Sequence, residues 1–329
     1  MPDADQNQWL PAEYEPGLVS VVIPTFNRAK LLCETLESVF KQDYRPLEII
    51  VGDDASTDAT LDRLQALRGE CPDGVRLEVF TNEKVGACAL RNRGAARAKG
   101  EFLMFADSDD VLHEGALSAL VRGIGEADLA YGQWRDWFSE ESPSRYSEPV
   151  VRECGDDLLV DLLKQQWLLP TAVLHRRASL LRVSGWDPSY PVEQDFEFMT
   201  RVALAGAQYV AVDKLVADYR RHGDSQLSAI ALSERTRVTE RVLRSVESAL
   251  DESGWTPQRR EALAWRWYRE ARYSWLWLRD KQRLNMLMRE AYRVQASFRP
   301  PKGWYRISAK LLGYANTERL AAVARKLFR

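Results

Sequence analysis

The sequence predicts an α/β protein with a doubly wound, mainly parallel sheet, followed by an α-helical C-terminal extension. In the first third of the chain, short apolar segments of strand length alternate with segments whose apolar residues recur at helical spacing. This alternation is typical of strand–helix–strand units, which build parallel sheets with right-handed crossovers. From Leu232 onward the strand-like segments cease and only helical spacing remains.

The first strand–helix unit begins with the apolar segment 19–23, which stops at Pro24. Apolar residues then recur at helical spacing over 31–40, and Asn27 is able to cap this helix. Polar side chains at Thr25 and Asn27 follow the strand directly, so we expect them at the rim of the sheet.

The following units repeat this order. Segment 47–51 is apolar and strand-like, and a short helix is expected over 60–67. Segment 75–80 alternates apolar and polar residues, as a half-exposed strand does, and a helix over 85–98 ends at Gly100. The pitch of this alternation supports the doubly wound architecture.

The strongest chemical signal follows the apolar segment 102–106, which ends abruptly in the carboxylates Asp107, Asp109 and Asp110. Because the carboxyl ends of parallel strands meet at one rim, we expect these acids near the acidic pair at 53–54. Asp107 and Asp109 alternate with one residue between them, so in an extended chain both point the same way. Such oxygen donors suit Mg²⁺ or Mn²⁺, which would hold a phosphate, although helix capping is an alternative role.

Several function classes are excluded by what the sequence lacks. No Gly-x-Gly-x-x-Gly follows the first strand and no P-loop motif is present, so a nucleotide would be held by carboxylates, backbone and metal. The four cysteines form no Cys-x-x-Cys pair, which argues against a zinc site and fits a reducing compartment. The acidic N-terminal extension, residues 1–16, does not resemble a secretory signal, and no apolar run is long enough to span a bilayer.

Charge is distributed unevenly along the chain. Residues 255–329 hold 18 Lys and Arg but only 5 Asp and Glu, whereas the whole chain has a net charge of −2. This region interleaves Trp and Arg, but it contains no recognised nucleic-acid-binding module, and we expect a stripe from Leu263 to Trp275 to form packed core. The segment 302–329 is basic and amphipathic, which suits an anionic membrane surface; packing on the catalytic domain or on a second subunit, as a homo-oligomer, is the alternative.

Six sequence blocks in a fixed order resemble the family 2 glycosyltransferases. They include Val-Ser-Val-Val-Ile-Pro-Thr-Phe-Asn-Arg at the start and Asp-Ser-Asp-Asp at the metal motif. The blocks occupy residues 19–28, 47–58, 86–101, 107–110, 185–197 and 219–225. The resemblance covers about 17–228 and implies the A-type glycosyltransferase fold, with inverting transfer from a nucleotide-diphosphate sugar.

The resemblance also implies a domain division and a donor site. The nucleotide-binding half is expected at 17–112, the acceptor half at 113–228 and a helical basic region at 229–329. Asp54 is the first choice for reading the base and Asp53 the second, since a carboxylate accepts the imide N–H of uracil. The nucleotide-binding residues implied are Pro24, Thr25, Asn27, Asp53, Asp54, Arg91, Asn92, Asp107 and Ser108.

The metal and catalytic residues follow from the later blocks. Asp109 is the first choice for ligating Mn²⁺ or Mg²⁺, with Asp107 and His222 as further members of the metal shell. Asp195 is the expected general base, since inversion needs one carboxylate to take the proton of the acceptor hydroxyl. Glu193 is the alternative base or an acceptor ligand; Gln194 stands where the family usually has an acid.

The function expected is metal-dependent inverting transfer from a UDP- or dTDP-sugar to a glycan or lipid-linked acceptor. A nucleotide-sugar-binding protein without turnover and a nucleotidyltransferase on a similar fold are the alternatives. We expect a cytoplasmic protein, with residues 302–329 as the candidate contact with the inner face of the membrane, and no nucleic-acid partner.

Overall fold

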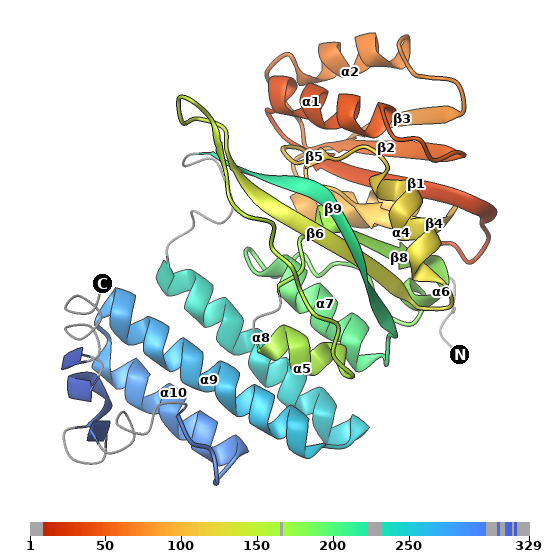
Figure 1. Ribbon diagram of the computed structural model, residues 1–329. Helices are drawn as coiled ribbons and strands as arrows, with labels where there is room; N and C mark the ends of the chain where they lie inside the picture. The colour runs from red at the N-terminus through yellow and green to blue at the C-terminus, as the bar shows by residue number, and fades with distance from the viewer. Residues whose placement is uncertain are drawn as a thin grey trace. The chain divides into compact units, whose positions relative to one another are not determined.

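The structure of the protein is a computed structural model in which the chain forms two compact units (Figure 1). It describes residues 9–164, 167–222, 232–300, 308–309, 313–317 and 319–320. The first unit comprises residues 1–154, 167–190 and 201–224, and the second comprises 155–166, 191–200 and 225–329. The predicted domain boundary after residue 228 falls in 223–231, outside the described residues.

The N-terminal half of the sheet is parallel, as the sequence predicted. Its strands lie in the order β3-β2-β1-β4, and every pair of neighbours is parallel. The bounds are β1 (Glu15–Thr25), β2 (Leu47–Asp53), β3 (Val75–Thr81) and β4 (Gly100–Phe105). All seven residues of β2 are buried, as expected for a central strand covered on both faces.

Three helices connect these strands: α1 (Ala29–Phe40), α2 (Thr60–Arg68) and α3 (Ala87–Ala95). Helices α1 and α2 lie side by side, and α3 packs against β1 and β2 (Figure 1). The prediction that Asn27 caps α1 is wrong. The N-cap is Arg28, without a side-chain cap, because the Asn27 side chain instead accepts a hydrogen bond from the Thr57 amide at 2.8 Å.

The sheet continues beyond β4 with mixed strand directions. The order runs β4-β8-β6-β9-β5, with β7 paired to β6; β8 is antiparallel to both of its neighbours, whereas β6 and β9 are parallel. The bounds are β5 (Val111–Leu112), β6 (Leu129–Phe138), β7 (Arg145–Tyr146), β8 (Val173–Arg176) and β9 (Tyr209–Arg221). Helix α4 (Ala116–Ile124) packs on β6 and β9, and α6 (Arg177–Leu180) follows β8. The α/β class is therefore confirmed, with a sheet that is parallel in its first half and mixed in its second.

The second unit is helical. Helix α9 (Pro257–Leu278) packs against α5 (Leu158–Leu163), α8 (Leu232–Ser253) and α10 (Lys281–Val294). The stripe predicted from the sequence is its core, because Leu263, Trp267, Ala271 and Trp275 are all buried. Helix α7 (Gln194–Leu204) contributes its first turns to this unit.

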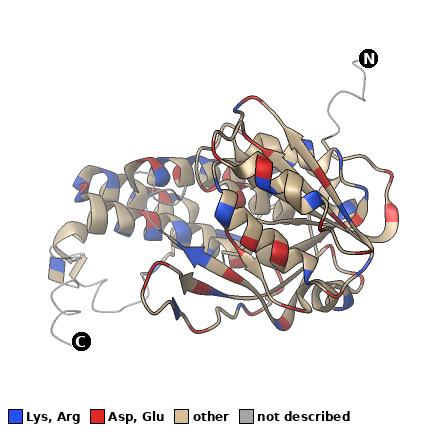
Figure 2. Ribbon diagram, turned by 90° about the horizontal axis from the view of Figure 1, so that it is seen from above, with Lys and Arg blue, Asp and Glu red and all other residues tan. Residues whose placement is uncertain are grey.

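Much of the positive charge after residue 255 is paired within this unit. Figure 2 shows acidic residues among the basic ones on the helices that precede the C-terminus. Arg283 of α10 lies 2.8 Å from Glu240 of α8, and Arg293 lies 2.5 Å from Glu247. Most of 302–329, the segment predicted to contact a membrane, lies outside the described residues. No described helix is both long and apolar enough to cross a bilayer.

Candidate active site

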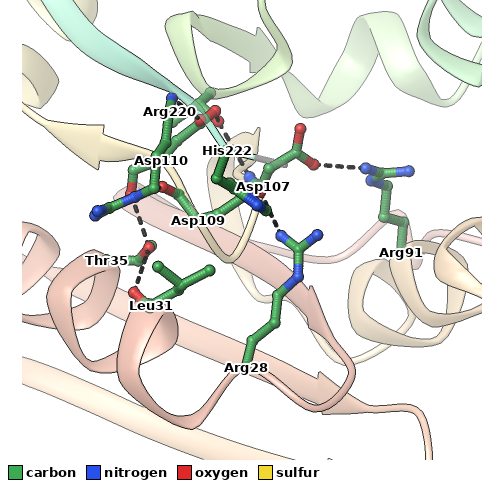
Figure 3. A network of polar contacts seen from close by, with 10 residues as sticks. Arg28, Leu31, Thr35, Arg91, Asp107, Asp109, Asp110, Arg220 and His222 are labelled. Atoms are coloured by element: carbon green, nitrogen blue, oxygen red, sulfur yellow. Dashed lines mark hydrogen bonds and ion pairs between the residues drawn. The ribbon is translucent and has the colours of Figure 1, made fainter. Parts of the chain in front are cut away.

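Asp109 lies just beyond the end of β4, where a guanidinium and an imidazole contact its carboxylate (Figure 3). The Arg28 Nη1 and the His222 Nε2 lie 2.5 and 2.8 Å from the same oxygen, Oδ2. Arg28 comes from the turn before α1 and His222 follows β9, so segments far apart in the sequence converge on one acid. Asp109 and His222, both predicted as metal ligands, are in direct contact in the structure.

The adjacent acids at 109 and 110 differ in ionisation. Burial alone would raise the pKa of Asp109, but the hydrogen bond from His222 and the charge of Arg28 outweigh it and hold that pKa below its ordinary value. Burial and the charges of Asp109 and Asp107 raise the pKa of Asp110 well above its ordinary value. Asp110 is enclosed by protein and accepts a hydrogen bond from the Thr171 hydroxyl at 2.7 Å. Asp109 is thus the charged acid of the two, while Asp110 anchors the loop.

Asp107 faces a different cation. The Arg91 Nη2 lies 2.7 Å from its Oδ1, and the Asp107 side chain is 29% exposed, whereas Arg91 is buried. The Arg91 guanidinium lies 4.5 Å from the ring centre of Trp186. The structure therefore brings together Arg91 and Asp107, which the sequence placed in one nucleotide site, and keeps Asp107 open to solvent.

Asn92 fixes the backbone of Trp186, whose ring lies beside Arg91, through two hydrogen bonds. Its side-chain amide donates to the Trp186 carbonyl at 2.8 Å, and its side-chain oxygen accepts from the Trp186 amide at 2.7 Å. A Cβ at Gly185 would come within 2.4 Å of that oxygen, so the close approach requires glycine. Ser108, between the two acids, is buried.

The ends of β1 and β2 place Thr25 beside Asp53 in parallel register, and Pro24 beside Gly52. Asp54 is the residue that the sequence analysis preferred for contact with the base. Its carboxylate accepts hydrogen bonds from the Val85 amide at 2.6 Å and from the Gly86 amide at 3.1 Å. These contacts hold the turn that leads into α3.

Two neighbouring polar atoms at this rim have no hydrogen-bond partner within the described part of the chain. Asp53 uses Oδ2 to accept from the Ser56 amide at 2.9 Å, but its Oδ1 is buried and unsatisfied, as is the Thr25 hydroxyl. Buried polar atoms are rarely left without a partner, so an unsatisfied pair suggests a missing ligand. Asp53 therefore has a carboxylate oxygen that the described residues leave unused, whereas both Asp54 oxygens accept hydrogen bonds.

Sequence reasoning missed Arg28 and Glu34. Glu34 of α1 lies 2.5 Å from the Nη2 of Arg220, a buried residue of β9 whose Nε also donates to the Asp109 carbonyl at 2.8 Å. Arg220 thereby connects the loop 107–110 to α1. The available signal for Arg28 was its place as the last residue of the first family-like block, immediately before a helix.

The predicted catalytic acids lie in the second unit. Asp195 is half-buried in the first turn of α7, and its Oδ1 accepts from the Phe196 amide at 2.9 Å. The Glu193 carboxylate lies 2.5 Å from Arg235 and 3.8 Å from Arg266. Ion pairs thus hold the Glu193 carboxylate just before the first turn of α7, two residues before Asp195.

The side chains that could ligate a metal at this site suit an ion that takes further ligands from a phosphate. Among the described residues, no three His, Cys, Asp or Glu side chains gather as a complete protein cage would require. Mg²⁺ sites on nucleotides typically use one or two carboxylates and take their other ligands from phosphates and water. Asp109, in contact with His222, and the partly exposed Asp107 supply carboxylates of this kind.

Comparison with known proteins identifies the family. The model of glycosyl transferase family 2 matches residues 20–184, half of the chain. The chain belongs to glycosyl transferase family 2. This agrees with the blocks quoted above and with the observed α/β fold.

One relative and two structures of similar fold are informative for this family 2 glycosyltransferase. The GalNAc(5)-diNAcBac-PP-undecaprenol beta-1,3-glucosyltransferase of Campylobacter jejuni is 43% identical over 110 residues, which are 33% of this chain and 35% of that protein. This chain thus spans about a third of that relative's length. S. aureus TarS 1-349 in complex with UDP-GlcNAc has a TM-score of 0.65 at 21% identity, covering 94% and 91% of the two chains. The mannosyltransferase PcManGT of Pyrobaculum calidifontis, in complex with GDP-Man and Mn2+, has a TM-score of 0.56 at 17% identity over 94% and 88%.

Proposed function

We propose that this family 2 protein is a metal-dependent inverting glycosyltransferase that moves a sugar from a UDP- or dTDP-sugar to an acceptor hydroxyl. The observation that carries this proposal is the buried, ionised Asp109, with Arg28 and His222 on one of its oxygens. A carboxylate with a guanidinium beside it, at the rim of an α/β sheet, suits a diphosphate accompanied by a cation.

Asp109, His222 and Asp107 would hold Mn²⁺ or Mg²⁺. When bound, such an ion neutralises the charge that develops on the departing nucleoside diphosphate. The chain's own guanidinium groups, Arg28 and Arg91, already contact Asp109 and Asp107 and can turn to phosphate oxygens as donors. The complex of PcManGT with Mn2+ supports this assignment by fold likeness.

Asp53 and Thr25 would hold the base and ribose. A carboxylate accepts the imide N–H that uracil and thymine share, and the hydroxyl of Thr25 offers both a donor and an acceptor. The unsatisfied oxygens of these two residues support this role. The complex of TarS with UDP-GlcNAc supports a uridine donor.

Replacement of Asp53 by Asn should weaken UDP binding about tenfold, the effect of losing one hydrogen bond of about 1.4 kcal/mol. The Asn oxygen can still accept from the Ser56 amide, but the new amide group cannot accept the imide proton. Calorimetric titration of UDP measures the effect, and Asp54→Asn is the neighbouring control. If Asp54→Asn weakens UDP binding more than Asp53→Asn, Asp54 reads the base.

In the proposed reaction Asp195 takes the proton of the acceptor hydroxyl while that oxygen attacks the anomeric carbon. The bond from that carbon to the diphosphate oxygen breaks, the nucleoside diphosphate leaves with the bonding electrons, and the configuration inverts. Glu193 is the alternative base; we prefer Asp195 because it keeps the acid that stands before an aromatic residue in the family-like block.

The acceptor class we propose is a glycan or a lipid-linked saccharide at an anionic membrane surface. The name of the C. jejuni relative, which refers to an undecaprenol diphosphate, supports a lipid-linked acceptor. Residues 302–329 contain seven Lys or Arg and one Glu, with Trp304, Tyr305, Leu327 and Phe328 available to insert. Each basic residue near such a surface contributes about 1 kcal/mol, which salt screens.

Truncation after residue 301 should abolish binding to anionic vesicles at low salt and leave UDP affinity unchanged. Co-sedimentation with vesicles of anionic lipid measures binding, and neutral vesicles are the control. A truncated protein that sediments as well as the full chain would refute the membrane role and leave packing on protein, including a homo-oligomer, as the role of the tail.

A donor screen tests the function itself. The purified protein is incubated with UDP-, dTDP- and GDP-sugars, with undecaprenyl diphosphate saccharides as acceptors and Mn²⁺ present, and released nucleoside diphosphate is quantified. We expect release from a UDP- or dTDP-sugar. Binding of such a donor with no release under any of these conditions would instead favour a binding protein.

A further inference from the structure

Glu193 adopts an unusual conformation at the start of α7. Its φ is +55°, in the left-handed region that residues other than glycine seldom occupy. Its carbonyl accepts from the Glu197 amide at 2.9 Å and so forms part of the first turn of α7. Such a conformation persists when the surroundings hold it in place.

Two helices of the second unit hold this residue. The Nε of Arg235, on α8, lies 2.5 Å from Glu193 Oε1, and the Nη2 of Arg266, on α9, lies 3.8 Å from Oε2. The Glu193 side chain is 12% exposed and Arg266 is 6% exposed, whereas Arg235 is half-exposed. The better-shielded contact, with Arg266, is therefore less weakened by solvent.

Arg266 is itself fixed from two sides. Its Nε lies 3.2 Å from Oε1 of Glu270, one turn further along α9, and Glu270 is buried. Its guanidinium lies 4.4 Å from the ring centre of Phe196, the residue that follows Asp195. Arg266 thus contacts the residues that lie two before and one after the half-buried Asp195.

We propose that Arg266, assisted by Arg235, is a positioning residue that aligns the Asp195 carboxylate by holding Glu193 and Phe196 on either side of it. The C-terminal helices then form part of the catalytic apparatus. This inference rests on the proposed role of Asp195 as the base. Misplacement of a reacting group by about 1 Å can cost 10²-fold in rate, so a group that fixes the segment can control turnover without touching substrate.

The charges around Arg266 are consistent with this role. Burial raises the pKa of Glu270, and burial followed by the charge of Arg266 lowers the pKa of Arg269 to about 10. Arg266 is the group common to Glu193, Glu270 and Arg269. Its removal would leave the Glu193 carboxylate with Arg235 as its only remaining ion-pair partner among the described residues.

The test compares Arg266→Gln with Arg283→Gln in the full-length protein. Arg283 is a half-buried arginine of the same unit that pairs with Glu240 and has no ion pair with Glu193, so it controls for loss of an ion pair. We expect Arg266→Gln to lower kcat about 10- to 100-fold, with donor KM and UDP affinity within twofold of wild type. Arg266→Lys should restore part of the loss, and Arg283→Gln should keep kcat.

Glu193→Gln supplies a second variant if Arg266→Gln does not fold, as monitored by thermal unfolding. We expect the same selective loss of kcat, and the double variant Glu193→Gln/Arg266→Gln should be no slower than the slower single variant. An Arg266→Gln protein as active as Arg283→Gln, or a loss that appears in donor KM, would overturn the inference. If Arg266→Gln and Asp195→Asn are both active, Asp195 is not the base. If Arg266→Gln is active and Asp195→Asn is inactive, only the positioning role of Arg266 fails.

Discussion

Asp195→Asn is expected to lower turnover by about 10²–10⁴-fold, the range for loss of a general base. The amide cannot take a proton from the acceptor hydroxyl, but its oxygen can still accept from the Phe196 amide, as Asp195 does now. Helix α7 should therefore form normally, and UDP affinity should remain within twofold of wild type. Steady-state rates at saturating donor measure the loss.

Glu193→Gln discriminates between the two candidate bases. If Asp195→Asn keeps more than a third of wild-type turnover while Glu193→Gln is inactive, Glu193 is the base. If both variants keep wild-type turnover, the base lies elsewhere in the chain. Because Asp195 keeps the acid that precedes an aromatic residue in the family-like block, we expect Asp195→Asn to be the slower variant.

Asp109→Asn is expected to remove most of the metal dependence of nucleotide binding. The substitution takes away the one carboxylate that both Arg28 and His222 contact, and a neutral amide is a poor ligand for Mn²⁺. We expect UDP affinity in Mn²⁺ to fall at least tenfold, to about the level of the wild type in chelator.

Asp110→Asn is the matched control, since it changes the adjacent residue in the same way. Asp110 is buried against Thr171, and its raised pKa favours a neutral carboxyl, so the amide replaces a group of similar charge and shape. Its UDP affinity in Mn²⁺ should stay close to that of wild type. A larger effect at 110 than at 109 would mean that the metal ligand has been misassigned.

The parallel half of the fold was predictable because its signals are local. Each strand among β1 to β4 is an apolar or alternating segment, and helical spacing separates it from the next strand. The acids at 107 and 109 were placed correctly at the rim because they directly follow β4, whose carboxyl end lies beside that of β1 in the parallel sheet. The C-terminal helices followed from the stripe containing Trp267 and Trp275, both buried.

The second half of the sheet could not be predicted in the same way. Strand β8 spans only Val173–Arg176 and pairs antiparallel with β4 and β6, and four residues carry too little periodicity to be recognised. Strand direction there is decided by packing between segments far apart in the sequence.

Ion pairs between residues far apart in the chain were the other feature that the sequence did not predict. Nothing local indicates that Arg28 would meet Asp109, or that Glu193 would meet Arg266, because each pair joins residues at least 70 positions apart. For the same reason the sequence does not show that the Asp54 carboxylate accepts hydrogen bonds from the Val85 and Gly86 amides, which come from another loop. Motif spacing identified the acids, and only the three-dimensional contacts separate their roles.

Calorimetric titration of the wild-type protein with UDP, in Mn²⁺ and then in excess chelator, tests the central claim most directly. In the proposed site Asp109 and His222 contact the cation, and Asp53 and Thr25 contact the base and ribose. We therefore expect UDP to bind in Mn²⁺ and its affinity to fall at least tenfold in chelator. Equal affinity under both conditions would contradict the metal site, and no heat with UDP, dTDP or GDP would contradict the nucleotide-sugar transferase itself.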